Sequence, residues 1–467
     1  MEERSRTVKD EEERKLLRPS VDVSTAVRLC NETWELSGGI SIQEAGVVEL
    51  DGYDDRNFLV RVGGGSGDAG DAGDAGDARG GTKKGGKYVL KFHNGVESVR
   101  YASAIDAQVA LLVYLRSRGL NVNEPLATRD GALVRRVDVP VHGGGAAPIA
   151  VRLLSFVEGR VMKEVTSQSD TLLEAAGRFV GEMDHLLDEF EHEGMRRPHL
   201  WDSRNALHLR QFLTCVTDET HRVMCERILT GFEKDVMPLA QQNKLRSGII
   251  HGDANDTNLL IDHNDDTRIV GVIDFSDTLL SWRVCEISVS AAYAMYDICT
   301  RSSVSAHALD IDHTEKCMFF FLCPAFVSYM RTKLTRKMTY ARSLTLRVVC
   351  IHLIVVATIM NDIIITKNSG RIYRLRKEDP VSDAIHVIRG YTSAYPLLDD
   401  EITALPTLIA CRLVCTCVLG AYSYSQDPGN DYLLATQKPG WDALEALVAE
   451  MGAPLNSRIR LACSHTP

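Results

Sequence analysis

The sequence predicts an α+β protein with two lobes, in which an antiparallel sheet and one helix precede a larger, mainly helical lobe. The chain has 467 residues, more than one compact unit usually holds. Apolar runs typical of strands occur up to about residue 157, and apolar residues mostly recur at helical spacing beyond it. We therefore expect an N-terminal lobe at residues 21–157 and a C-terminal lobe at residues 158–467.

The composition indicates a globular protein and argues against a nucleic-acid-binding one. Hydrophobic residues make up 45% of the chain, which is enough for a sizeable core. The net charge of -10 argues against a nucleic-acid partner, because phosphate contacts need clustered Lys and Arg. A small cationic substrate is compatible with this acidity, and we expect no nucleic acid among the partners.

The cysteines and the N-terminus point to a reducing, cytoplasmic setting. The 12 cysteines form no C-x-x-C pair and no Cys/His cluster with zinc spacing. Residues 1–20 are densely charged and lack the apolar core of a signal peptide. We expect this segment to be a disordered, solvated tail, or else an exposed helix.

The N-terminal lobe begins with a short helix within residues 20–35, indicated by apolar residues at helical spacing. A longer helix is expected at residues 98–117, with Ile105, Val109 and Leu112 on one face and Gly119 at its end. Residues 63–86 repeat Gly-Asp-Ala and are expected to form a disordered loop. The strands are expected at residues 46–50, 57–62, 87–92, 133–137 and 149–157.

The C-terminal lobe begins with a helix whose apolar residues form one stripe. Leu172, Ala176, Val180, Met183 and Leu187 recur at helical spacing and are expected in the core. Further along, the apolar helix at residues 282–295 contains a single acid, Glu286. A buried charge needs a partner, so we expect an ion pair there.

Between these helices, residues 249–262 and 271–278 form a motif in which we expect β-strands rather than helices. Ile249 and Ile250 lead into His251, Gly252 and Asp253, and a polar loop follows. Residues 259–261 resume a strand, and residues 269–273 return as its hairpin partner. Three polar residues therefore converge at one mouth of the hairpin: Asp253, Asn258 and Asp274.

These three residues suit phosphoryl transfer. The reaction needs a carboxylate to orient and deprotonate the attacking hydroxyl, and oxygen ligands to hold magnesium on the phosphates. Asp253 fits the first role, and Asn258 and Asp274 fit the second. Each could instead be an ordinary turn residue. The ordered set H-G-D, four residues, N, then an apolar hairpin ending in I-D-F favours the catalytic interpretation.

With HGD in place of HRD, and with Ser276 and Asp277 after IDF, the motif resembles the aminoglycoside phosphotransferase and choline kinase family. Within that family the chain is similar to the hydroxylysine kinases, in stretches that span nearly its whole length. The resemblance implies a two-lobed, protein-kinase-like fold, Mg²⁺, and transfer of a phosphoryl group from GTP to 5-hydroxylysine, with ATP as the alternative donor. The stretches are GYDDRNFLV at 52–60, YVLKFHN at 88–94, VRLLSFVEGR at 151–160, HGDANDTNLL at 251–260 and DYLLATQKPGW at 431–441.

The resemblance also implies roles in the N-terminal lobe. Lys91, on a strand with apolar neighbours, is the candidate for pairing with the nucleotide phosphates. Asp106 is the nearest acid on the following helix to hold this lysine, although it is one methylene shorter than the usual glutamate. Residues 52–57 take the place of a glycine-rich loop, with Arg56 as a phosphate contact, although a plain hairpin turn fits equally well.

Acceptor choice leaves alternatives open. A choline, homoserine or aminoglycoside kinase would share the scaffold, and a nucleotide-binding pseudokinase is a rival outside enzymes. A protein kinase is disfavoured because no A-P-E segment follows IDF. Acids near the HGD loop, Asp256 and Asp277, are candidates for binding acceptor ammonium groups. Trp201 either contacts a cationic substrate or packs the lobe.

Residues 299–378 depart from the family and form an atypical insertion. It contains two apolar runs, at residues 317–330 and 348–360. A membrane span needs about 20 apolar residues, and the second run extends to residue 365 only by including Asn361 and Asp362. We therefore do not expect a membrane association.

Overall fold

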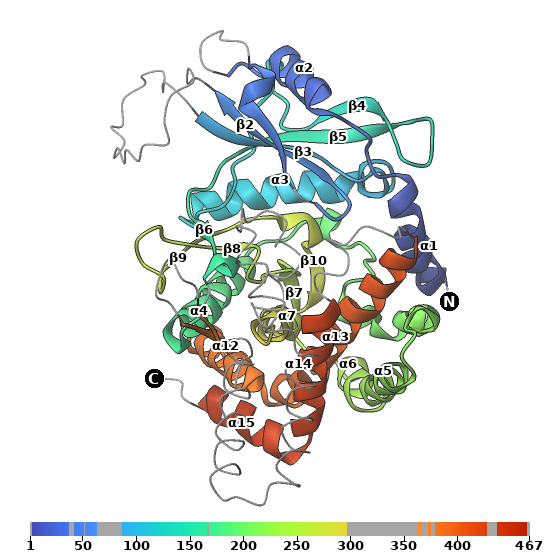
Figure 1. Cartoon of the computed structure of the whole chain (residues 1–467), viewed down its shortest axis with the longest axis vertical. Helices are drawn as coiled ribbons and strands as arrows, with labels where there is room; N and C mark the ends of the chain where they lie inside the picture. The colour runs from blue at the N-terminus through green and yellow to red at the C-terminus, as the bar shows by residue number, and fades with distance from the viewer. Residues whose placement is uncertain are drawn as a thin grey trace, which may run out of the picture.

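The residues described by the computed structural model form two lobes, with a sheet at the top of Figure 1 and helices below it. The α+β fold class is thus confirmed. The predicted disordered loop, except Gly86, and both apolar runs of the insertion lie outside the described residues. The structure describes residues 2–36, 42–50, 52–62, 86–165, 168–296, 363–365, 372–374, 379–426 and 437–464.

A five-stranded antiparallel sheet forms the N-terminal lobe, in the order β1-β2-β3-β5-β4. Phe58, Leu90 and Ile149 on its central strands are fully buried in one cluster with the apolar face of α2. Asp22 caps α2, because its Oδ1 accepts a hydrogen bond from Thr25 N at 2.8 Å. The elements are α2 (Val23–Thr33), β1 (Val47–Leu50), β2 (Arg56–Val62), β3 (Gly86–Phe92), α3 (Ala102–Ser117), β4 (Arg135–Pro140) and β5 (Ala146–Ser155).

Helix α3 lies below the sheet, between it and the helical lobe (Figure 1). Its buried Leu111 and Leu115 belong to the hydrophobic core of the helical lobe rather than to the sheet cluster. The chain itself crosses between the lobes just after β5, because β6 (Arg160–Val161) already pairs with a strand of the helical lobe, β8 (Leu259–Ile261). Helix α3 therefore packs against the helical lobe, and the chain passes from the sheet to that lobe between β5 and β6.

Two short strand pairs carry the motif of the helical lobe. The predicted hairpin is confirmed: β8 pairs with β9 (Ile269–Val272) in antiparallel register. In addition, β7 (Ser247–Ile250) pairs with β10 (Leu279–Trp282), a strand that the sequence did not reveal. Asp253 follows β7, Asn258 precedes β8 and Asp274 follows β9, so the motif residues share one edge.

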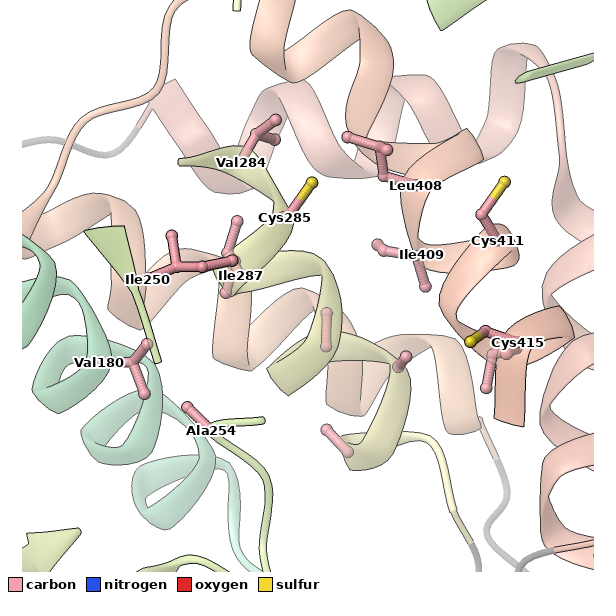
Figure 2. Close-up of a cluster of buried hydrophobic side chains, with 14 of the residues drawn as sticks. Val180, Ile250, Ala254, Val284, Cys285, Ile287, Leu408, Ile409, Cys411 and Cys415 are labelled. Atoms are coloured by element: carbon pink, nitrogen blue, oxygen red, sulfur yellow. The ribbon is translucent and has the colours of Figure 1, made fainter. Parts of the chain in front are cut away.

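The helices around these strands bury a continuous core (Figure 2). Figure 2 shows Val180 of α4, Ile250 of β7, Ile287 of α7 and Ile409 of α13 in this core. The predicted stripe on α4 is confirmed, because Leu172, Val180 and Leu187 are buried. The helices are α4 (Asp170–Leu187), α5 (Glu219–Gly231), α6 (Met237–Gln241), α7 (Val284–Ala294), α12 (Pro380–Ala394), α13 (Asp399–Gln426), α14 (Gln437–Glu450) and α15 (Ala453–Ser464).

Helices α4 and α12 approach closely because glycines face each other across their contact. A Cβ atom on Gly177 would lie 1.9 Å from the carbonyl oxygen of Val387. A Cβ atom on Gly390 would lie 2.0 Å from the carbonyl oxygen of Glu174. No side chain fits at either position without moving the helices apart.

The disordered tail expected at residues 1–20 is wrong for most of that segment. Glu2–Leu16 form helix α1, and four polar residues on one side of it are buried: Thr7, Asp10, Glu11 and Arg14. Hydrogen bonds to other parts of the chain stabilise this face. Arg14 Nη1 donates to Glu97 Oε2 at 3.0 Å, and Thr7 Oγ1 is hydrogen-bonded with His208 Nδ1 at 2.8 Å. The alternative of a helix is confirmed, but its exposure is not, because hydrogen bonds and ion pairs bury one polar face of it.

Helix α13 is long and apolar enough to cross a membrane by length and composition alone. Within the fold, 83% of its apolar window is buried against other parts of the protein. That burial is typical of a core helix. The run at residues 348–360, whose transmembrane character the sequence analysis considered, lies outside the described residues.

Candidate active site

His251 fixes the course of the loop that follows β7. Its buried ring packs against the ring of Phe275, with centroids 4.5 Å apart. Nε2 donates to the carbonyl oxygen of Ile273 at 3.1 Å, and Nδ1 accepts from the backbone N–H of Asp253 at 3.2 Å. Burial lowers the pKa of His251 to about 4. The neutral ring therefore links the two strand ends and does not act as a charged group.

Glu286 supports the same loop from α7. Its buried carboxylate accepts hydrogen bonds from the backbone N–H groups of His251 and Gly252. Burial raises the pKa of Glu286 to about 8. The expected ion pair is replaced by these backbone contacts, and Arg283, one turn away, pairs with Asp188 at 2.7 Å. Backbone amides can stabilise a carboxylate as a cation does, which sequence alone does not reveal.

Three side chains hold the Asp253 carboxylate. Asn258 Nδ2 donates to Oδ2 at 3.0 Å, and also to the backbone carbonyl of Asp253 at 2.9 Å. Asn255 Nδ2 donates to Oδ1 at 3.0 Å. Arg412 of α13 completes the set, with Nη2 at 2.7 Å from Oδ1. The carboxylate keeps 24% of its exposure, so it is oriented yet still accessible.

The charge of Asp253 is set by opposing effects. Burial, helped by the neighbouring carboxylates Asp277 and Asp274, raises the pKa of Asp253 to about 8. The positive charge of Arg412 opposes this rise. A carboxyl group whose pKa lies near neutrality can take a proton from a substrate and release it again, as a general base must.

Lys91 is held between two carboxylates. Its buried Nζ lies 2.8 Å from Asp55 Oδ2 and 3.2 Å from Asp274 Oδ1. Ser276 Oγ donates to the same oxygen of Asp274 at 2.7 Å. Although burial disfavours the charged amine, Asp274 and Asp55 raise the pKa of Lys91. Burial also works against charge on Asp274, but Lys91 lowers the pKa of that carboxyl.

Asp106 does not hold Lys91, and this prediction is wrong. Asp106 is exposed on α3, whereas the fully buried residue two positions further along, Gln108, faces the site. Gln108 Nε2 donates to the carbonyl of Ser276 at 3.1 Å, and its Oε1 accepts from Arg152 Nη2 at 2.9 Å. The lysine partner comes instead from Asp55, in the turn between β1 and β2.

Arg56 also lies apart from the other predicted residues. Its Nε is 2.6 Å from Glu49 Oε1, and its Nη2 donates to the carbonyl of Val21 at 2.9 Å. Both partners belong to the N-terminal lobe. Arg56 thus ties β2 to the β1 edge and to the start of α2, while the adjacent Asp55 enters the site.

Asn258 and Asp274 offer a donor set that fits a divalent cation. Backbone pairing of Ile273 N with Asn258 O at 2.9 Å brings the two side chains to neighbouring strand ends. Because Asn258 uses Nδ2 on Asp253, its Oδ1 is left as an oxygen ligand. Among the described residues there is no group of three His, Cys, Asp or Glu side chains able to hold a metal. A cation bound by these two side chains would take its remaining ligands from phosphate oxygens and water, as Mg²⁺ usually does.

Arg412 and Asp277 provide opposite charges beside Asp253. Arg412 lies over the Trp201 ring, 5.1 Å from its centroid, and its buried Nε has no hydrogen-bond partner among the described residues. Asp277 keeps 30% of its exposure and lies 3.7 Å from His199 Nε2. Burial raises the pKa of Asp277 although nearby arginines oppose the rise. Trp201 therefore packs against a buried cation of the protein itself.

The sequence analysis missed two residues of this site, Asp55 and Arg412. Arg412 is the only charge in the apolar stretch LIACRLVCTCVLGAYSY, and the reasoning applied to Glu286 would have found it. Asp55 gave no such signal, because a turn rich in Asp needs no special explanation. Its role depends on how the β1–β2 turn folds over the sheet.

Comparison with known proteins agrees with this geometry. Residues 51–309, more than half of the chain, match the phosphotransferase enzyme family. Hydroxylysine kinase of Xenopus laevis is 22% identical over 443 residues, covering 92% of this chain and 90% of that protein. Hydroxylysine kinase of Bos taurus is 24% identical over 412 residues, covering 86% and 84% respectively.

Solved structures share the fold. An amicoumacin kinase in complex with AMP-PNP and Ca²⁺ superimposes with a TM-score of 0.52 at 14% identity, covering 96% of this chain and 97% of the other. A microcompartment-associated aminopropanol kinase gives a TM-score of 0.53 at 14% identity, covering 92% and 98%. The chain therefore belongs to the phosphotransferase enzyme family, as a small-molecule kinase that transfers a phosphoryl group from a nucleotide to a hydroxyl group.

Proposed function

We propose that the protein transfers the γ-phosphate of GTP to the side-chain hydroxyl of 5-hydroxy-L-lysine, giving 5-phosphohydroxylysine and GDP. The observation that carries the proposal is the pairing of Asp253 with Arg412 at 2.7 Å, with Asp277 close by. An amino-acid acceptor brings a carboxylate and ammonium groups along with its hydroxyl. A base flanked by an arginine and an acid suits such an acceptor, and the similarity to hydroxylysine kinases supports the choice.

In the proposed reaction, Asp253 accepts the proton of the acceptor hydroxyl while the hydroxyl oxygen attacks the γ-phosphorus. The bond between that phosphorus and the β,γ-bridging oxygen breaks, and its electron pair leaves with GDP. Asn258 and Asn255 keep the carboxylate directed at the hydroxyl through their hydrogen bonds. Positioning of this kind supplies much of the rate enhancement in phosphoryl transfer.

The nucleotide is held by residues of β3 and of the β8–β9 hairpin ends. Lys91, kept charged by its two carboxylate neighbours, is placed to bind phosphate oxygens. Asn258 and Asp274 would hold Mg²⁺, which when bound neutralises charge that develops on the phosphates. Ser276 fixes the Asp274 carboxylate through its hydroxyl. The residues of the chain thus orient both reactants before the transfer.

The choice of GTP rests on the resemblance to hydroxylysine kinases, and ATP is the alternative donor. We also propose a cytoplasmic location, with neither nucleic acid nor membrane as a partner. The proposal of this location rests on the cysteines, which form no C-x-x-C pair in the sequence. Their burial raises the pKa of several, Cys30 and Cys225 among them, which makes these thiols unreactive.

A screen of hydroxylated amines with GTP and ATP tests the proposal, with nucleoside diphosphate release and phosphorus NMR as readouts. Hydroxylysine with GTP should give the highest kcat/KM. Lysine should be inert because it has no hydroxyl, and choline should be poor because it lacks a primary amine and a carboxylate. Equal kcat/KM for choline and hydroxylysine would refute the assignment of hydroxylysine. Nucleotide binding without turnover on any acceptor would instead identify a pseudokinase.

A further inference from the structure

Asp274, the expected metal ligand, has a strained backbone conformation. Its φ angle is 60°, in the left-handed region that residues with a side chain rarely adopt. Among the described residues, Asn243 is the other non-glycine residue with a positive φ. Such strain persists only where the surrounding structure enforces it. The contacts that hold this turn therefore bear on the direction of the Asp274 carboxylate.

Ser276 connects Asp274 to two residues from outside the turn. Its Oγ donates to Asp274 Oδ1 at 2.7 Å, and its backbone N–H donates to the same oxygen at 3.3 Å. The carbonyl oxygen of Ser276 then accepts two hydrogen bonds. Arg197 Nη2 donates to it at 2.6 Å, and Gln108 Nε2 donates to it at 3.1 Å. One carbonyl oxygen is thus held by donors from two distant segments of the chain.

Arg197 is itself anchored to the N-terminal lobe. Its side chain is 2% exposed, and Nη1 donates to Glu97 Oε1 at 3.2 Å. Glu97 lies between β3 and α3 in the N-terminal lobe, whereas Arg197 lies between α4 and α5 in the helical lobe. Hydrogen bonds from Arg14 to the Glu97 carboxylate fix this carboxylate from a third segment. The Arg197 guanidinium therefore connects a carboxylate of one lobe to the metal-binding turn of the other.

We propose that Arg197 is a positioning residue for the metal: together with Gln108 it holds the Ser276 carbonyl, and so keeps the Asp274 carboxylate directed at the cation. Outer contacts of this kind orient metal ligands. Because Glu97 and Gln108 belong to the N-terminal lobe, the turn is held only while the two lobes keep this contact. Without Arg197 the turn can relax, and the ligand leaves its position. The inference rests on the proposed role of Asp274 as a metal ligand.

The test measures binding of a non-hydrolysable GTP or ATP analogue by titration calorimetry over a range of Mg²⁺ concentrations. Arg197→Met removes the donors but keeps an extended side chain. It should raise the Mg²⁺ concentration for half-maximal binding roughly 10-fold, at the lower end of what losing a hydrogen bond with a charged group costs. Saturating Mg²⁺ should restore wild-type affinity. Arg197→Lys should recover part of the loss, and Arg196→Met, at the adjacent exposed arginine, should behave as wild type.

A second variant tests the other donor to the same carbonyl. Gln108→Glu retains an acceptor for Arg152 but loses the N–H that binds Ser276. It should raise the Mg²⁺ requirement in the same direction as Arg197→Met. Arg197→Met should fold, because Arg14 still pairs with Glu97, and its melting temperature reports this. If Arg197→Met does not fold, Gln108→Glu decides the question alone.

Two results would overturn the inference. One is that the folded Arg197→Met variant needs no more Mg²⁺ than Arg196→Met. The other is that its nucleotide affinity stays low at saturating Mg²⁺, which would indicate a structural role only. Asp274→Ala separates this inference from the proposed function. Metal-dependent binding by Asp274→Ala would remove the metal ligand and this inference together, whereas loss of that binding in Asp274→Ala alone would overturn only the role of Arg197.

Discussion

At the scale of single residues, the most direct test concerns Asp253. Asp253→Asn keeps the shape of the side chain but removes the proton acceptor. We expect kcat to fall roughly 10² to 10⁴-fold, the usual contribution of a positioned general base, with nucleotide affinity nearly unchanged. Steady-state kinetics together with nucleotide titration measure both quantities. Turnover close to wild type would remove Asp253 from the mechanism.

Asp274 should act on the nucleotide rather than on the acceptor. Asp274→Ala removes the charged ligand of the metal, so metal-dependent nucleotide binding should be lost in titration calorimetry. Asp265→Ala, in the exposed turn between β8 and β9, serves as the matched control and should bind as wild type does. Unchanged affinity of Asp274→Ala for the magnesium nucleotide would contradict the assigned role.

Arg412 should set the pH at which the base works. Its positive charge opposes the raised pKa of Asp253, so its removal should raise that pKa further. Because the base must be unprotonated, the acidic limb of the kcat/KM profile of Arg412→Gln should move to higher pH, and added alkali should restore part of the activity. Arg389→Gln, which breaks the pair between Arg389 of α12 and Glu174 of α4, provides the control. An unshifted profile with uniformly lower activity would indicate a purely structural role.

At the scale of elements, the glycine contact between α4 and α12 makes a sharp prediction. Gly177→Ala would place a methyl group 1.9 Å from a backbone oxygen of α12. The helices must separate, at a cost of about 1–3 kcal/mol in the free energy of unfolding. Gly231→Ala, at the end of α5 with no atom within 4 Å of its Cβ position, should be neutral or slightly stabilising. Chemical denaturation measures both, and equal stabilities would show that α4 and α12 can adjust freely.

Helices and strands whose apolar residues recur at regular spacing were predictable from the sequence. The burial of an element through polar contacts was not. The stripe from Leu172 to Leu187 and the β8–β9 hairpin were found because burial of apolar side chains imposes their spacing. Helix α1 buries Thr7, Asp10 and Arg14 through hydrogen bonds with partners more than 80 residues away. Such partners cannot be read from a local pattern.

In the candidate site, too, residues close together in the sequence were predicted, and partners from distant segments were not. The motif residues Asp253, Asn258 and Asp274 lie on one short segment, so their order predicted that they meet. The partners Asp55 and Arg412 come from a distant turn and a distant helix. Asp106 was chosen by analogy for its place on a helix, but the helical period turns Gln108 toward the site instead. Side-chain direction along α3 decided the outcome, not proximity in sequence.

At the scale of the whole molecule, the insertion is expected to be dispensable. Helices α7 and α12 flank it and pack against each other, so a short connection could join them. Deleting residues 303–377 should preserve activity and improve soluble yield, because it removes two apolar runs whose sequences favour aggregation. Expression and kinetics of the deletion variant provide the measurement. Loss of both yield and activity would show that the segment is an integral part of the lobe.

The contact between Tyr53 and Ser423 has a consequence for the order of events during synthesis. These residues are 370 positions apart, and Thr7 lies 201 positions before its partner His208. A growing chain emerges N-terminus first and its early parts can fold on the way. The first helix and the β1–β2 turn must nevertheless wait for their partners, and Asp253 waits for Arg412. Chains that stop before α13 therefore lack the assembled site, and phosphoryl transfer can begin only after this helix has been synthesised.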